Sequence, residues 1–322
     1  MAHTLNNSSH SFIFVTNAMI SIADIINVVV SGILLGTIYS LFSIGLNLIF
    51  GVMKIINFAQ GEFIMLGMYI AYLIWLYTTI SPYVALPIIF VIFLLYGFLM
   101  YLLIGKRLIG KSDTTQILST VGLALVLQNL CLVIFKADYY MVNLNLPTVS
   151  LIEGIYLRTE TLIAGSVAIA IMITMYYFIT KTGLGNAIRA TSQNLAAAST
   201  LGINPNKMFA IAWGIGSASV GVAGALFVTY YTVSYSVSPL LGLISFVVVV
   251  MGGLGSFEGG LIAGVILGVV EIASGYFISS MLRYFFVFIA FLITLILLPG
   301  GIGEWLNSIR LERELKRKLK SR

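Results

Sequence analysis

The feature that most constrains this chain is a succession of long apolar runs separated by short polar connections. Most of the runs are about 18–25 residues long, which is the length that a helix needs to cross roughly 30 Å of hydrocarbon. They do not alternate as the strands of a membrane barrel would, and lipid allows only helices and closed barrels to pair every backbone polar group internally. The sequence therefore predicts an all-α, polytopic transmembrane helical bundle.

The composition and the number of runs agree with this fold. Only 9% of the 322 residues are charged and 60% are apolar, whereas a soluble domain carries roughly 25% charged residues because its surface faces water. We expect eight to nine spans, since the run at 240–252 covers only about two-thirds of a bilayer. The apolar segments are 25–50, 62–79, 83–104, 115–135, 161–180, 208–231, 240–252, 259–279 and 284–298.

Basic residues indicate which ends of the spans face the cytoplasm, because Lys and Arg concentrate in cytoplasmic loops. The 105–112 loop, the 181–207 loop and the C-terminal tail are basic, whereas the 136–160 connection holds three acidic residues and is placed outside. With nine spans, the N-terminus then also lies outside. The predicted parts of the chain are a polar N-terminal arm at 1–24, a transmembrane domain at 25–303 and a basic cytoplasmic tail at 304–322.

The composition also excludes several kinds of function. The net charge of +6 comes largely from seven basic residues in the last thirteen positions, which is typical of a cytoplasmic tail near the lipid bilayer and not of a nucleic-acid site. The single cysteine, Cys131, excludes an intramolecular disulfide and a multi-cysteine metal site. The two histidines, His3 and His10, lie in the N-terminal arm. We predict no metal, no cofactor and no intramembrane catalytic constellation.

One motif suggests nucleotide binding, but its context argues against that interpretation. Residues 105–112 match G-x-x-x-x-G-K-[ST] letter for letter. That loop binds phosphate only when a strand precedes it and a helix N-terminus follows it, so that backbone amides surround the phosphate. A predicted membrane helix precedes the motif here. We interpret it as a cytoplasmic loop that fixes topology.

A polar stretch between the first two apolar runs predicts a helix that is broken inside the membrane, and the short run at 240–252 is the candidate for a segment that enters the membrane without crossing it. Asn57, Gln60, Gly61 and Glu62 lie in the polar stretch. A helix that restarts near Gly61 would present free amides and its positive dipole end to an anionic group such as a carboxylate. Non-helical backbone at membrane depth must pack on protein or line a cavity. The residues alone do not separate this interpretation from an ordinary short loop at the membrane face.

Two further features concern contacts between helices. Glu271 is an isolated charge within a predicted span, where a charge costs about 2.5–3.5 kcal/mol even on insertion scales. We expect it to make a structural hydrogen bond to a neighbouring helix in preference to a pathway role. Gly32 with Gly36, and the three glycines at 260, 264 and 268, form small-residue ridges that let helices approach closely.

The 181–207 loop is the most informative segment outside the spans. It is alanine-rich between Asn186 and Leu201, which predicts one short helix that Gly202 ends. Nothing in the loop supports chemistry. On the residues alone, it is either a plain connecting helix or a helix that docks on a cytoplasmic partner.

Three stretches in this order resemble the LivH-type permease subunit of branched-chain amino acid ABC importers: GLNLIFGVMKIINFAQGEFIMLG, GLGNAIRATSQNLAAASTLGINPNK and VVVVMGGLGSFEGGLIAGVILGVVE. The resemblance spans about residues 29–303. It implies a multi-pass cell-membrane permease whose partners are a related second permease, two cytoplasmic ABC ATPases, an extracytoplasmic binding protein and the amino-acid substrate. It also implies a coupling helix in the 181–207 loop. The positions that it identifies as ATPase-contacting or loop-shaping are Gly185, Arg189, Ala197, Ala198 and Gly202.

The sequence departs from the family pattern at three places. Gln60 stands where the family often has histidine, so a titratable role is absent there. Gln193 and Asn194 stand where acidic residues are frequent, which leaves packing and helix geometry to transmit motion. Glu258 stands where proline is more frequent, so the resemblance does not fix the shape of that loop.

Two alternatives to a branched-chain amino acid importer remain open. Urea and short amides are moved by close relatives within the family, so the substrate class has an alternative. A standalone secondary transporter would need coupling ions at midplane carboxylates, for which only Glu271, Glu62 and Asp24 are available. Dependence of uptake on ATP and on added ATPase subunits separates these two classes of transporter.

Overall fold

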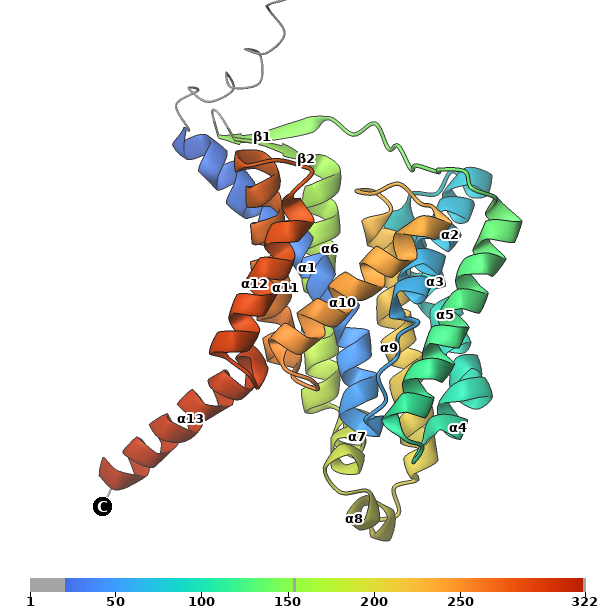
Figure 1. Cartoon of the computed structure of the whole chain (residues 1–322), viewed down its shortest axis with the longest axis vertical. Coiled ribbons are helices and arrows are strands. Elements are labelled where there is room, and N and C mark those ends of the chain that lie inside the picture. Colours follow the sequence, from blue (N-terminus) through green and yellow to red (C-terminus); the bar gives the residue numbers. More distant parts are fainter. Residues whose placement is uncertain (1–20, 153–154, 321–322) are drawn as a thin grey trace, which may run out of the picture.

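The computed structural model describes residues 21–152 and 155–320, which form a bundle of long helices (Figure 1). Nine helical stretches in this described part are long and apolar enough to cross a membrane, which confirms the predicted polytopic all-α fold. The elements are α1 (Ile22–Met53), α2 (Gln60–Thr78), α3 (Pro82–Met100), a π-helical turn η1 (Tyr101–Gly105), α4 (Lys106–Leu108), α5 (Asp113–Phe135), β1 (Thr148–Ile152), β2 (Ile155–Arg158), α6 (Thr159–Lys181), α7 (Gly183–Gln193), α8 (Leu195–Thr200), α9 (Pro205–Phe227), a 3₁₀ turn η2 (Tyr235–Val237), α10 (Ser238–Gly252), α11 (Phe257–Phe277), α12 (Arg283–Leu297) and α13 (Gly301–Lys320).

Two boundaries differ from the sequence prediction. The run at 240–252 is longer than its apolar residues suggest, because η2 and α10 together form an 18-residue helical stretch, Tyr235–Gly252. α1 begins at Ile22, a few residues before the predicted start, because Ser21 and Asp24 form a capping box around its first turn. The predicted N-terminal arm lies outside the described residues up to position 20.

The two ends of the bundle carry the loops that the charge pattern assigns to opposite sides of the membrane. α4, α7 and α8 lie together at one end, and α13 leads away from the bundle toward the same side (Figure 1). We call this the basic end, and its location in the cytoplasm stays a prediction of the positive-inside rule. The opposite end carries an antiparallel hairpin, in which Thr148 pairs with Arg158. The sequence predicts only an external connection at 136–160 and not this hairpin.

Helix α9 is the most enclosed span, and α1, α2 and α3 pack around it. Small residues make this possible. A Cβ added to Gly221 would lie 2.1 Å from the ring of Phe93 in α3, and one added to Gly224 would lie 2.3 Å from the carbonyl oxygen of Ile64 in α2. Only glycine fits at either position, so α9 can serve as the axis of the bundle.

The two glycine ridges predicted from the sequence pack against each other across α1 and α11. A Cβ added to Gly268 would lie 2.4 Å from both the carbonyl oxygen of Gly32 and the Cα of Gly36. One added to Gly36 would lie 2.5 Å from the Cα of Val265. The two helices therefore touch backbone to backbone, and van der Waals contact supplies the attraction that apolar burial does not supply within lipid.

Substitution of Gly268 tests this contact. Gly268→Ala should lower the thermal unfolding midpoint of the detergent-extracted protein, because overpacking a tight interior costs about 1–3 kcal/mol, and Gly268→Leu should abolish most monodisperse protein in size-exclusion chromatography. Gly122→Ala is the matched control, since no atom lies within 4 Å of a Cβ added there. Equal midpoints for Gly268→Ala and Gly122→Ala would contradict the assigned packing.

Candidate functional site

The polar stretch around 57–62 turns the chain back into the bundle. α1 ends at Met53, and Lys54 adopts a left-handed conformation (φ 57°). α2 then begins at Gln60, whose side-chain amide donates a hydrogen bond to the carbonyl oxygen of Phe42 at 3.1 Å. Phe42 lies eleven residues before the end of α1, which corresponds to about 16 Å along a helix. α2 therefore begins deep inside the bundle. We call residues 54–59, which lead back into it, the re-entrant segment.

The non-helical residues 54–59 are packed on protein for most of their length. Asn57 is 1% exposed and Ala59 is fully buried. The Asn57 side-chain oxygen accepts a hydrogen bond from the backbone N–H of Ala59 at 3.1 Å, and the ring of Phe58 stacks on Phe246 of α10 with 5.7 Å between centroids. Of the two interpretations left open by the sequence, the structure therefore matches the broken helix and not a loop at the membrane face.

Gly61 lies where the start of α2 meets α10. A Cβ added to Gly61 would lie 2.1 Å from the carbonyl oxygen of Ser238 and 2.6 Å from the backbone nitrogen of Gly242. Any side chain at this position would have to displace the α10 backbone. Gly61 therefore shapes the site by letting the two helices approach each other.

A small cavity opens between this segment and α10. Its volume is about 180 Å³, and its polar lining consists of Asn57, Gln60, Glu62 and Ser238. The Ser238 hydroxyl lies beside the Glu62 carboxylate and donates a hydrogen bond to the carbonyl oxygen of Tyr235 at 3.2 Å. Among the described residues, Asn57 Nδ2 and Gln60 Oε1 are buried without a hydrogen-bond partner. The apolar wall consists of Leu46, Phe58, Pro239, Leu243 and Phe246. The cavity thus combines a carboxylate with an apolar surface, and one unpaired donor and one unpaired acceptor are buried in residues of its lining.

The sequence predicts one side of this cavity and not the other. It points to Asn57, Gln60 and Glu62, but not to Ser238 and Gly242. A weak signal was present, since Ser238 precedes a proline that suits the first turn of a helix and Gly242 interrupts the short apolar run. Neither feature indicates which segment packs against α10.

Glu271 does not line the cavity but makes the hydrogen bond to a neighbouring helix that the sequence predicts. It is 4% exposed, and one of its carboxylate oxygens accepts a hydrogen bond from the hydroxyl of Tyr39 in α1 at 2.6 Å. The other oxygen lies 3.8 Å from Nε of Arg283, at the start of α12. The Arg283 guanidinium also lies over the ring of Tyr284, 4.7 Å from its centroid. The carboxylate therefore connects α1, α11 and α12.

The prediction of one continuous helix in the 181–207 loop is wrong. The loop forms two helices, α7 and α8, because Asn194 adopts an extended conformation (φ −153°) between them. Its side chain accepts a hydrogen bond from the backbone N–H of Ala197 at 3.0 Å and so caps α8. The predicted stop is present: Gly202 has a φ of 80°, and the N–H of Ile203 bonds to the carbonyl of Ala198 at 3.1 Å.

The five predicted coupling positions lie at the basic end in two different environments. Gly185 and Ala198 are buried, and a Cβ added to Gly185 would lie 2.3 Å from the carbonyl oxygen of Phe178 in α6. Arg189, Ala197 and Gly202 are exposed. Gly185 and Ala198 therefore fix how α7 and α8 sit on the bundle, and Arg189 and Ala197 are accessible to a partner.

The structure separates residues 105–112 from a phosphate-binding loop. α3 continues through η1 into α4, so a helix and not a strand precedes the motif. A Cβ added to Gly105 would lie 2.2 Å from the ring of Trp213, which shows that this glycine serves helix packing. Ser112 caps the first turn of α5. The motif is a short connection between α3 and α5 at the basic end.

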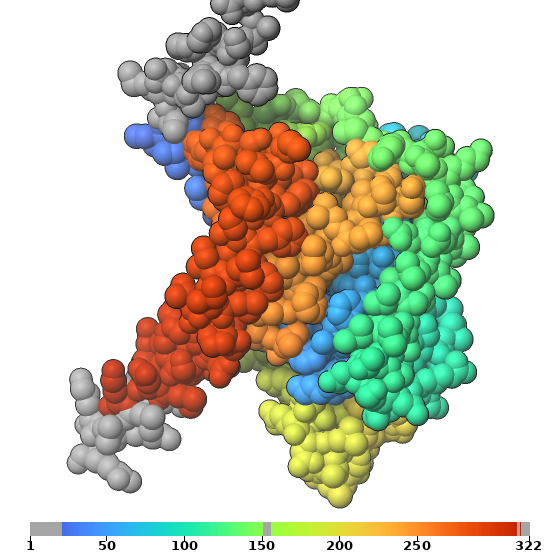
Figure 2. Space-filling model, in the orientation of Figure 1, coloured from blue at the N-terminus to red at the C-terminus, as the bar shows by residue number. Residues whose placement is uncertain are grey.

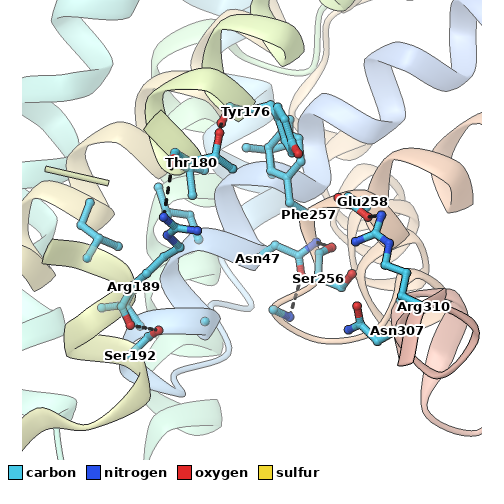
Figure 3. Close-up of a pocket in the computed structure, with 18 residues that line it drawn as sticks. Asn47, Tyr176, Thr180, Arg189, Ser192, Ser256, Phe257, Glu258, Asn307 and Arg310 are labelled. Carbon is cyan, nitrogen blue, oxygen red and sulfur yellow. Dashed lines mark hydrogen bonds and ion pairs between the residues drawn. The ribbon is translucent and has the colours of Figure 1, made fainter. Parts of the chain in front are cut away.

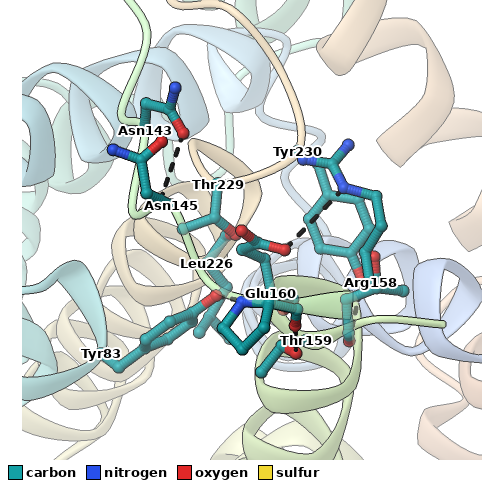
Figure 4. Close-up of polar contacts among 11 residues, drawn as sticks. Tyr83, Asn143, Asn145, Arg158, Thr159, Glu160, Leu226, Thr229 and Tyr230 are labelled. Carbon is teal, nitrogen blue, oxygen red and sulfur yellow. Dashed lines mark hydrogen bonds and ion pairs between the residues drawn. The ribbon is translucent and has the colours of Figure 1, made fainter. Parts of the chain in front are cut away.

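Polar contacts close the opposite end of the bundle, and sequence analysis did not predict them (Figure 4). The hydroxyl of Tyr83 in α3 donates to the carbonyl of Glu160 at 3.1 Å, and the hydroxyl of Tyr230 donates to the carbonyl of Thr161, also at 3.1 Å. Arg158 lies 3.8 Å from the Glu160 carboxylate. The start of α6 is thus attached to α3 and to the segment that follows α9.

Comparison with known proteins places these features in a family. The family described as the permease component of the branched-chain amino acid transport system matches residues 28–297. The high-affinity branched-chain amino acid transport system permease protein LivH of Escherichia coli (strain K12) is 28% identical, over 84% of this chain and 93% of that protein. BraD of Pseudomonas aeruginosa, with the same description, is 26% identical over 85% of this chain and 94% of that protein. A probable branched-chain amino acid permease of Methanocaldococcus jannaschii is 28% identical over 84% and 90%, respectively. No solved structure matches the chain significantly.

Removal of the Tyr39 hydroxyl tests the role of Glu271. Tyr39→Phe should destabilise the protein by about 1–3 kcal/mol, because a buried carboxylate loses a hydrogen-bond donor. Tyr77→Phe, at a position that is 80% exposed, is the control. In a double-mutant cycle measured by unfolding in detergent, Tyr39→Phe should cost clearly less when Glu271 is already leucine. Additive costs of the two substitutions would show that the pair does not interact.

Proposed function

We propose that this chain, which belongs to the family of permease components of branched-chain amino acid transport systems, is the membrane-spanning subunit of an ATP-binding-cassette importer for branched-chain or other hydrophobic amino acids. As a transport component it is not itself an enzyme. In the proposed assembly, a related second permease lies beside it and two ATPases bind at the basic end. An extracytoplasmic binding protein delivers the amino acid at the opposite end, and ATP is hydrolysed on the ATPases.

The observation that carries the substrate proposal is the cavity between the re-entrant segment and α10. An aliphatic amino acid brings an ammonium group, a carboxylate and an apolar side chain. The Glu62 carboxylate can accept a hydrogen bond from the ammonium group. Gln60 Oε1 and Asn57 Nδ2 are themselves buried, so they would contact the ammonium group and the carboxylate only after a shift between α2 and α10. The first-turn amides of α2 favour the same negative group. Leu243 and Phe246 offer apolar surface to the side chain.

Such a site should hold its substrate weakly. An importer that receives substrate from a binding protein needs no tight site of its own, because a deep energy well would slow release. The small cavity has a single charged group, Glu62, which suits transient contact. Because α2 begins here and meets α10 at Gly61, a shift between the two helices would change the width of the cavity.

We propose that α7 and α8 transmit the motion of the ATPases. Their exposed positions Arg189 and Ala197 would contact the ATPases, whereas Gly185 and Ala198 hold the two helices on α6 and on the rest of the bundle. The contact would depend on packing and helix geometry, because Gln193 and Asn194 carry no charge.

The substrate site is tested by Glu62→Gln. This change removes the charge that faces the ammonium group but keeps an acceptor oxygen, so the apparent KM for leucine should rise roughly tenfold, in line with the stronger hydrogen bonds that charged groups make. The measurement is uptake of labelled leucine by the complex reconstituted with its partners, beside ATP hydrolysis. Glu304→Gln, at an exposed position on α13, should leave KM unchanged.

Several results would contradict this assignment. An unchanged KM in Glu62→Gln would remove this residue from the pathway. If urea or a short amide, and not leucine, inhibited uptake, the substrate of the site would belong to the urea and amide class. Uptake without ATP and without ATPase subunits would support a secondary transporter. Gly61→Leu should also block uptake. Because the new side chain would clash with the α10 backbone, this variant does not separate a binding role from a packing role, whereas Glu62→Gln does.

The coupling surface is tested by Arg189→Glu. The reversal of charge should leave insertion and folding intact, because Arg189 is exposed, and should weaken binding of the ATPases. We expect reduced substrate-stimulated ATP hydrolysis in the reconstituted complex. Lys106→Glu, an exposed charge reversal in the other basic loop, is the control. Normal stimulation in Arg189→Glu would place the coupling surface elsewhere.

A further inference from the structure

Two adjoining cavities occupy the basic end, away from the re-entrant segment. The first, which we call the polar cavity, has a volume of about 390 Å³ and lies between α1, α6, α7, α11 and α13. In Figure 3, Arg189 and Arg310 approach it from opposite sides, with Asn47 and Ser256 between them. Ser192 and Asn307 add further polar groups to its lining.

The second, which we call the apolar groove, has a volume of about 620 Å³. It runs between α6 and α11 and reaches α13. Its apolar lining includes Ile169, Met172, Ile173, Leu261, Ile262 and Leu306. The residues that line both spaces are Tyr176, Phe257, Glu258 and Arg310. The polar cavity and the apolar groove are therefore two halves of one amphipathic site.

The polar cavity has an excess of positive charge. Glu258 pairs with Arg310, and Arg189 has no carboxylate partner among the described residues. The Arg189 Nη2 donates to the carbonyl of Thr180 at 3.3 Å and to the side-chain oxygen of Asn186 at 2.5 Å. A guanidinium carries five N–H donors, so Arg189 retains donors for an additional acceptor. An anionic oxygen group complements this lining.

The position of α6 sets the depth of both spaces. Tyr176 lies five residues before the basic end of α6 at Lys181, and its ring packs against that of Phe257 with 5.7 Å between centroids. Tyrosine is typical of the level of the lipid head groups. Ile173, about one turn deeper, is 64% exposed, so the groove borders the surrounding hydrocarbon.

From this arrangement we propose that the polar cavity and the apolar groove together bind one anionic glycerophospholipid of the cytoplasmic leaflet. Its phosphate lies between Arg189 and Arg310, and one acyl chain lies in the groove. Of the two exposed positions proposed to contact the ATPases, Ala197 lies outside the lining of the polar cavity, so bound lipid would share only Arg189 with them. The cytoplasmic leaflet supplies anionic lipids that basic groups attract. A free phosphate or an amino acid would use the polar cavity and leave the apolar groove empty, whereas a phospholipid fills both. Because Arg189 belongs to α7 and Arg310 to α13, the lipid connects these two helices.

The test uses the full-length protein in a neutral detergent. Phosphatidylglycerol should raise its thermal unfolding midpoint and remain bound in native mass spectrometry, and phosphatidylcholine should do so far less. Arg310→Gln should weaken retention of phosphatidylglycerol roughly tenfold, because charge-assisted hydrogen bonds to phosphate are lost. Ile173→Trp, which narrows the groove without touching the polar cavity, should also weaken it.

Two matched controls accompany these variants. Arg313→Gln removes an exposed charge from the same helix as Arg310 but outside the cavity, and Val133→Trp adds a ring at a 78% exposed position on α5. Both should retain phosphatidylglycerol as the unaltered protein does. Ile173 lines only the apolar groove, whereas Arg310→Gln removes the charge of a side chain at the border of the two spaces. Since the two variants alter different residues, failure of one variant to fold leaves the other as a test.

Four results would overturn the proposal. Equal retention of phosphatidylcholine would show that charge is not recognised. If inorganic phosphate or glycerol phosphate raised the thermal unfolding midpoint as much as phosphatidylglycerol does, and Ile173→Trp did not change this rise, the ligand of the polar cavity would be free phosphate. Loss of retained lipid on adding the ATPase subunits would assign it to the ATPase. Unchanged lipid retention in both Arg310→Gln and Ile173→Trp would exclude the site altogether.

Discussion

Backbone contact between α1 and α11 holds the frame on which the rest of the molecule depends. Because Gly32, Gly36 and Gly268 lack side chains, the helices approach closely enough for many weak dispersion contacts to act together. α1 is thereby fixed, and the carbonyl oxygen of Phe42 in its middle becomes an anchor. Gln60 donates to it at 3.1 Å and Ser245 of α10 at 3.4 Å. The start of α2 and the middle of α10 therefore both form a hydrogen bond to the same carbonyl group of α1.

This anchor explains how a polar, non-helical segment persists at membrane depth, where an unpaired polar group is costly. The oxygen of Asn57 and the amide nitrogen of Gln60 each have a protein partner, and the carboxylate of Glu62 lies beside the Ser238 hydroxyl. The remaining buried groups, Asn57 Nδ2 and Gln60 Oε1, belong to residues that line the cavity. The segment thus satisfies most of its polar groups and leaves one buried donor and one buried acceptor in the wall of the cavity, which is why we propose that a zwitterionic substrate passes there.

Features contained within one segment could be predicted from the sequence, whereas contacts between segments far apart in the chain could not. The spans followed from run length and the helix contacts from glycine spacing, because both patterns are contained within single segments. The sequence located the polar stretch at 57–62, but only the bond from Gln60 to Phe42 separates a broken helix from a loop. Ser238 could not be predicted because Glu62, the residue beside it in the cavity, lies far away in the sequence. The break at Asn194 was missed because the surrounding alanines favour a continuous helix, although asparagine is a strong N-cap.

That break has a mechanical consequence. With extended backbone at Asn194, α7 and α8 are two short helices separated at one residue. α7 abuts α6 through Gly185 and also packs against α1 and α9, whereas α8 packs against α7 and α9. Under the proposed function, a displacement of α8 would reach α9, around which α1, α2 and α3 are arranged, both directly and by way of α7. The same displacement would reach α6 by way of α7.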